Sequence, residues 1–220
     1  WVPRKAGFDK HEPAVLWQRA ILPYNMGFGM CSRQALDTAV ASMCTANFAT
    51  DGELFTDGAG APRGQEVIPA MCDSVGAAAV ALQWDDDGCN IDGCALALSS
   101  VPGAQTVPRA ETKAVVVGAP LVAPYASSLK VVPDASYVVT NLTKLVQAPK
   151  GTVATPLIGL NNDLWWQVMH AIPVDTHCDK VKSHLTIADV DAGIISWRYY
   201  VGNAIADAAA KAASRASILP

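Results

Sequence analysis

From Glu53 onward the chain passes through three strand-like segments and then alternates helix-like with strand-like segments, an order that few folds can accommodate. The three early segments are short runs of apolar or small residues: Leu54–Thr56, Val75–Trp84 and Cys94–Leu98. Asp85–Gly88 separates the last two and predicts a hairpin, because Asp and Gly adopt the left-handed conformations that tight turns require. A meander followed by alternating helices and strands predicts an α/β fold with a five-stranded mixed sheet flanked by helices.

The later segments continue this alternation. Predicted helices cover residues 109–117, 134–146, 162–172 and 200–217, a short helical turn covers 186–191, and strands cover 129–132 and 177–181. We therefore expect one domain over residues 51–220. Residues 1–50 are interpreted as a helical N-terminal extension, with helices at Glu12–Leu22 and from Ser32 to about Phe48, because their apolar residues recur at helical spacing. No chemistry is predicted in this extension.

Four acidic residues stand in contexts that suggest a shared site: Asp57, Glu111, Asp134 and Asp207. Asp57 and Asp134 each follow a short β-prone run, and the strand before Asp57 is expected to end there. Glu111 and Asp207 lie in alanine-rich, helix-favouring stretches. Carboxylates gathered from strand ends and helices are the oxygen ligands that Mg²⁺ prefers. Clustering them without a cation is costly, since like charges repel.

Each acid also has a purely structural interpretation. Asp57 could close a turn, Glu111 could interact with a helix dipole, Asp134 could cap the helix that follows it, and Asp207 could be an exposed helical residue. The occurrence of all four in one chain favours the shared site.

The motifs around these acids resemble those of the ribonuclease H family over residues 53 to about 215. They are Thr56-Asp57-Gly58, Arg109-Ala110-Glu111, Asp134 with Tyr137-Val138, and the segment from Asn203 to Asp207. The resemblance implies a metal-dependent endonuclease that cuts the RNA strand of RNA–DNA hybrids with two Mg²⁺ or Mn²⁺ ions. The four acids would be both catalytic residues and metal ligands.

The resemblance also assigns further residues. His184, in Lys182-Ser183-His184, matches a mobile histidine implied to assist proton transfer or product release. The substrate contacts would come from Gly58, Ala59, Gly60, Arg109 and Asn203. The chain departs from the family at Pro133, where threonine is usual, at Val107-Pro108, where asparagines often read the minor groove, and in lacking an evident basic protrusion. Only Lys144 and Lys150 flank the corresponding stretch, and the Thr186–Trp197 insertion lengthens the interval from His184 to Asp207.

Composition narrows the function further. Hydrophobic residues make up 51% of the chain and charged residues 16%, as expected for a globular protein. The formal net charge of −4 argues against a strongly basic protein that coats nucleic acid. No apolar run is long enough to span a membrane. Six scattered cysteines without a Cys-x-x-Cys pair suggest reduced thiols and an intracellular location, nuclear or cytoplasmic.

The primary hypothesis is therefore a ribonuclease H-type endonuclease, with residues 1–50 as a contact to a protein partner or to a parent polyprotein of retroelement type. The alternative is a non-catalytic scaffold or subunit with the same fold, favoured by the apolar composition and the missing asparagines. A 3′–5′ exonuclease or an integrase-like transferase is a second alternative, although such exonucleases usually open with Asp-x-Glu, and this chain has Asp57-Gly58-Ala59.

Overall fold

Six strands form one mixed sheet in the computed structural model, which describes residues 40–45, 48–60, 75–149 and 152–216. The strands are β1 (Val40–Cys44), β2 (Glu53–Gly60), β3 (Val75–Trp84), β4 (Ile91–Ser100), β5 (Ser128–Pro133) and β6 (Asp175–Cys178). Their order across the sheet is β1-β4-β3-β2-β5-β6. The β2–β5 and β5–β6 pairs are parallel and the other pairs antiparallel, so the predicted mixed sheet is confirmed.

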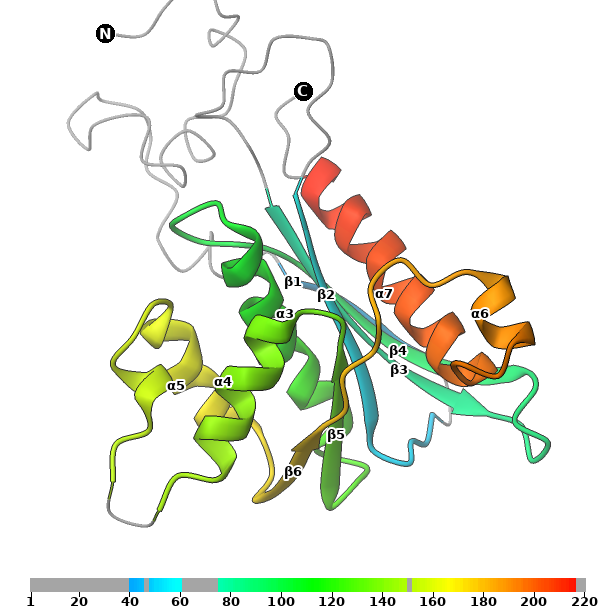
Figure 1. The fold of residues 1–220 in the computed structure, drawn as a ribbon, viewed down its shortest axis with the longest axis horizontal. Helices are drawn as coiled ribbons and strands as arrows, with labels where there is room; N and C mark the ends of the chain where they lie inside the picture. Colours follow the sequence, from blue (N-terminus) through cyan, green and yellow to red (C-terminus); the bar gives the residue numbers. More distant parts are fainter. Residues whose placement is uncertain (1–39, 46–47, 61–74, 150–151, 217–220) are drawn as a thin grey trace, which may run out of the picture.

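Helices cover both faces of this sheet. They are α3 (Val107–Val122), α4 (Ser136–Val146), α5 (Asn162–Ala171), α6 (Ile187–Asp191) and α7 (Trp197–Ala216), with the 3-10 turn η4 (Thr155–Leu157) before α5. Figure 1 shows α3, α4 and α5 gathered on one side of the sheet and α7 crossing the other. The helices predicted from residue 109 onward are thus confirmed, with α3 longer than predicted at both ends and α7 beginning earlier than predicted.

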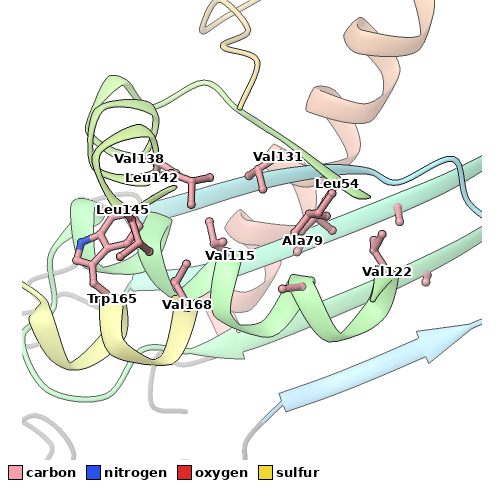
Figure 2. Close-up of a cluster of buried hydrophobic side chains, with 14 of the residues drawn as sticks. Leu54, Ala79, Val115, Val122, Val131, Val138, Leu142, Leu145, Trp165 and Val168 are labelled. Carbon is pink, nitrogen blue, oxygen red and sulfur yellow. The ribbon is translucent and has the colours of Figure 1, made fainter. Parts of the chain in front are cut away.

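The two faces of β2 contribute to different cores, because successive side chains on a strand point in opposite directions. Leu54 packs with residues of α3, α4 and α5, including Val115, Leu142 and Trp165. Figure 2 shows this cluster between the sheet and the three helices. Phe55 instead packs with Val132 and Ala206 on the α7 side. The side chain of Asp57, two residues after Phe55, is therefore directed to the α7 side.

Small residues allow α7 to lie close to the sheet. A Cβ atom added to Gly76 in β3 would lie 2.1 Å from the Ser214 amide nitrogen. One added to Gly202 in α7 would lie 2.4 Å from the Phe55 ring. Both distances are far inside van der Waals contact, so a larger side chain at either position would displace the helix.

The segment 40–44 differs from the prediction, which placed a helix from Ser32 to about Phe48. These residues form β1, which pairs antiparallel with β4, Val40 opposite Ser99 and Cys44 opposite Ala95. Thr45 secures the pairing, because its amide donates to the Cys94 carbonyl at 3.0 Å and its hydroxyl accepts the Cys94 amide at 3.0 Å. Pairing with an available sheet edge overrides a local helical pattern. The helix predicted at Glu12–Leu22 lies outside the described residues, and the domain boundary at residue 50 stays a prediction.

Strand β2 is also longer than predicted. It was expected to end at Asp57, but it continues through Gly58, Ala59 and Gly60, which pair with Ala77, Gly76 and Val75 of β3. The two glycines indicated a loop, yet the neighbouring strand supplies hydrogen-bonding partners to the end of the segment. Asp57 therefore lies inside a strand. In the part of the chain that the structure describes, no helix is long and apolar enough to cross a membrane.

Candidate metal centre

The register of β2 against β5 brings Asp57 and Asp134 together. The parallel pairing runs from Glu53 opposite Lys130 to Thr56 opposite Pro133, where β5 ends. Asp57 and Asp134 are the next residues on the two chains. Because β2 continues while β5 stops, the two carboxylates meet at the rim of the sheet. Asp134 does not cap α4, whose N-cap is Ala135 without a side-chain hydrogen bond.

Glu111 reaches the same rim from the other face of the sheet. It lies in the second turn of α3, where the helix backbone touches β2 at Gly58. A Cβ atom at Gly58 would lie only 2.4 Å from the Glu111 amide nitrogen and 2.7 Å from the Ala110 carbonyl carbon. The missing side chain at Gly58 therefore lets α3 approach until Glu111 meets Asp57.

Together Asp57, Glu111 and Asp134 offer carboxylate oxygens that all lie within 4.8 Å of one another. Asp57 and Glu111 are buried, with exposed fractions of 7% and 4%, and Asp134 is half-buried. The Gly58 amide donates to Asp57 Oδ1 at 2.9 Å, whereas Glu111 Oε2 is buried with no hydrogen-bond partner. Burying a carboxylate oxygen without a hydrogen-bond partner lowers stability, so this atom is well suited to act as a metal ligand.

Burial and mutual repulsion favour protonation of these acids in the absence of a cation. Burial, followed by the charges of Asp134 and Asp207, raises the pKa of Asp57 to about 6. Burial, followed by the charges of Asp57 and Asp134, raises the pKa of Glu111 to about 9. A divalent cation would reverse this preference, because it stabilises the ionised carboxylates.

Asp207 lies next to this cluster but is not one of its three members. It sits on α7, half-buried, and its charge contributes to the raised pKa of Asp57. Its Oδ2 atom accepts a hydrogen bond from Lys211 Nζ at 2.7 Å, one helical turn further on. The structure thus gathers three of the four predicted acids at one point and places the fourth nearby, paired with a lysine.

The donor set fits a hard divalent cation. All the donors are carboxylate oxygens, two of the three acids are buried, and one buried oxygen has no other partner. Mg²⁺ and Mn²⁺ prefer such ligands and are commonly held by a few carboxylates together with water. Asp57, Glu111 and Asp134 are the residues that could hold such an ion.

The other predicted site residues have different environments. His184 is exposed and has a φ of 55°, which places a non-glycine residue in the left-handed region. Asn203 is buried on α7, one turn before Asp207. Ala59 is buried, and Gly60 is exposed at the end of β2.

Arg109 is engaged within the protein. Its Nε donates to the Pro102 carbonyl at 2.7 Å, and its two terminal nitrogens donate to the two carboxylate oxygens of Asp163. The Asp163 pairing ties the start of α3 to the start of α5. Arg109 thereby positions the helix that carries Glu111.

Two residues of the site were not predicted. Asp163 is separated from Arg109 by 54 positions, so only the folded structure reveals the pair. Lys211 follows Asp207 by four residues, a spacing that by itself predicts a helical ion pair.

Solved structures resemble this fold. The solution structure of the PFV RNase H domain matches with a TM-score of 0.52 at 18% identity, covering 78% of this chain and 99% of that domain. LC9-RNase H1, described as a type 1 RNase H with the type 2 active-site motif, has a TM-score of 0.46 at 15% identity, covering 76% of this chain and 75% of that one. RNase H1 from the halophilic archaeon Halobacterium salinarum NRC-1 has a TM-score of 0.43 at 18% identity, covering 74% of this chain and 97% of that one.

No protein-family model matches the chain, and no curated protein matches its sequence. The structural likeness, with the strand order and the flanking helices, establishes a ribonuclease H-like fold. The expected fold class is therefore confirmed.

Proposed function

We propose that the chain is a metal-dependent endonuclease that hydrolyses the RNA strand of RNA–DNA hybrids. The observation that carries the proposal is the meeting of Asp57, Glu111 and Asp134 at one rim of a ribonuclease H-like sheet, with a buried Glu111 oxygen that has no partner. A purely structural role does not account for three acids held so close together, because their repulsion lowers stability.

The four acids would divide the work. Two Mg²⁺ or Mn²⁺ ions would supply an activated water and stabilise the departing 3′-oxygen. Asp57 lies close to Glu111 and Asp134, and the charge of Asp207 also acts on it, so its carboxylate would be shared. Glu111 must release its proton before it serves as a ligand. His184, which is exposed, would exchange a proton with solvent.

The remaining predicted residues would act on the substrate. The exposed backbone at Gly60 would contact the hybrid directly, whereas Gly58 and Ala59 are buried and would shape the strand beneath it. Arg109 and Asn203, also buried, would keep α3 and α7 in place beside the acids. Recognition through 2′-hydroxyls and the backbone would confer little sequence preference. Residues 1–50 would contact a protein partner or a parent polyprotein.

A cleavage assay tests the proposal. An end-labelled RNA–DNA hybrid is incubated with the full chain in Mg²⁺, in Mn²⁺ and in EDTA, beside matched DNA and RNA duplexes. We expect metal-dependent internal cuts in the RNA strand of the hybrid only. Asp57→Asn should abolish them. The control Asp86→Asn alters an exposed acid at the far hairpin and should cleave as the wild type does.

Absence of cleavage under every metal condition, with a folded protein, would favour the non-catalytic scaffold. Release of single nucleotides from one end would favour the exonuclease alternative. Calorimetry with Mg²⁺ then separates a scaffold that retains a cation from one that does not.

A further inference from the structure

An open groove lies between the segment that follows β6 and the segment that leads into α7. It has a volume of about 450 Å³, and its lining includes Lys180, Lys182, Leu185, Ile194 and Tyr199. A second hollow of about 460 Å³ is lined by residues 180–183. Two lysines therefore border both hollows, and the 186–197 insertion supplies part of the opposite wall.

The groove begins beside the acidic site. The Val181 amide donates to the Pro133 carbonyl at 3.0 Å, and Asp134 is the residue after Pro133. Val181 itself is buried against Val132 and Ala206, which anchors this end of the segment. Lys180 and Lys182 flank that anchor and are exposed. A polyanion bound at Asp134 would thus pass next to both lysines.

Most of the described cations are already neutralised by carboxylates. The cations within 4.0 Å of a carboxylate oxygen include Arg109, Lys130, Lys182, Arg198 and Lys211. Among the described residues, no carboxylate lies within that distance of Lys180 or Lys144. Lys180 borders the groove, whereas Lys144 lies near the end of α4.

Lys182 can be released from its carboxylate partner at little cost. Its contact with Asp189 is 3.4 Å long, and its side chain is 67% exposed. Asp189 is held independently, because Thr186 donates to it from its amide at 2.8 Å and from its hydroxyl at 2.7 Å. Exposed ion pairs contribute at most about 1 kcal/mol, so a phosphate competes readily for Lys182.

We propose that this groove holds the sugar-phosphate backbone of the hybrid, with Lys180 and Lys182 contacting successive phosphates. The proposal rests on the proposed function for the identity of the polyanion. Leu185 and Ile194 give the groove an apolar floor on which sugar rings pack. The arrangement would let a chain with a formal net charge of −4 hold a polyanion, because two exposed lysines flank the segment that lies beside the acidic site.

Binding measurements on a non-cleaving protein test the groove. The full chain carrying Asp57→Asn is titrated into a fluorescein-labelled RNA–DNA hybrid over a range of KCl concentrations, and anisotropy reports Kd. The Lys180→Gln/Lys182→Gln pair is added to this background and compared with Lys144→Gln, which removes another exposed charge near the end of α4. Lys180→Arg/Lys182→Arg keeps both charges and should bind as the parent does.

We expect the Gln pair to raise Kd about tenfold at moderate salt and to reduce the slope of log K against log salt by about 1–2, since each lost phosphate contact removes about 0.9. Lys144→Gln should change neither quantity by half as much. If the Gln pair matches Lys144→Gln in both Kd and slope, the proposal that Lys180 and Lys182 contact the phosphates is refuted.

This outcome is distinct from failure of the proposed nuclease. If the wild-type chain never cleaves the hybrid but its binding depends on the two lysines, the groove proposal stands and the nuclease proposal is refuted. If the chain with both lysines replaced cleaves normally at unchanged KM, the nuclease proposal stands and the groove proposal is refuted. A chain that binds no hybrid at all refutes the groove.

Discussion

Replacing Asp57 by Asn should stabilise the metal-free protein while it abolishes cleavage. The change keeps the shape of the side chain, and the new amide oxygen can still accept the hydrogen bond from the Gly58 amide. It removes the charge that Asp134 and Asp207 repel and that burial penalises. It also removes the charge that, after burial, contributes most to the raised pKa of Glu111.

The size of the effect follows from the pKa of Asp57, which is raised from 3.8 to about 6. Each unit corresponds to about 1.4 kcal/mol, so ionised Asp57 destabilises the fold by up to roughly 3 kcal/mol above pH 6. The buried amide of Asn offsets part of this. We expect a gain of about 1–3 kcal/mol at pH 8, or roughly 2–10 °C in Tm.

The sign depends on pH and on metal. Near pH 4 the Asp57 carboxyl is protonated in the folded chain and about half protonated in the unfolded chain, so most of the gain should vanish. In millimolar Mg²⁺ the wild type should gain stability through binding and the variant much less, so their order should reverse. Thermal melts in EDTA and in Mg²⁺, at pH 4 and pH 8, provide the measurement. A variant less stable than the wild type in EDTA at pH 8 would refute the electrostatic reasoning.

Four further predictions concern the same site. Because the pKa values of Asp57 and Glu111 are raised, metal-free stability should fall as pH rises from about 4 to about 9, and the Tm increase caused by Mg²⁺ should grow over that range; a pH-independent increase would contradict this. Gly58→Ala should destabilise by at least about 2 kcal/mol in denaturant melts. Gly60→Ala should be nearly neutral, because among the described residues its Cβ would meet only Val107, at 3.7 Å. Equal effects of the two substitutions would disprove the close packing of α3 on β2. Arg109→Gln should cost about 2 kcal/mol, and its combination with Asp163→Asn should cost less than the sum of the two; strict additivity would argue against the pair. Lys211→Gln should release Asp207 and lower the Mg²⁺ concentration for half-maximal cleavage about twofold, the equivalent of one exposed helical ion pair; an unchanged or higher requirement would show that Lys211 does not compete with the cation.

Local patterns in the chain predicted the helices and most of the sheet because those elements have strong local signals. The apolar runs at residues 75–84 and 129–132 became β3 and β5, and the small apolar stretch after Arg109 became α3. Local patterns were insufficient where the structure of a segment depends on its pairing with another strand. The residues of β1 fit a helix until the edge of β4 is available, and Gly58 and Gly60 suggest a turn until β3 pairs with them.

The site shows the same division. Asp57 and Asp134 could be predicted as neighbours, because each follows an apolar run in adjacent strands. The burial of Glu111 could not, since it depends on how closely α3 approaches Gly58. The roles of Arg109 and Asp207 also depend on partners that the fold brings to them, Asp163 and Lys211. The residue types suggested an acidic site, whereas the burial and the partners of each residue depend on how the chain packs.

The position of Asp207 on α7 has a consequence for biosynthesis. Asp57, Glu111 and Asp134 precede α7 in the chain, and α7 packs over β2 and β3, which are made much earlier. A nascent chain can pair its strands and bring three acids together before α7 has left the ribosome. It gains the fourth acid only when α7 docks, at the end of folding of the described domain. If the proposed function holds, the site with all four acids would therefore be complete only after α7 has been synthesised and has docked on the sheet.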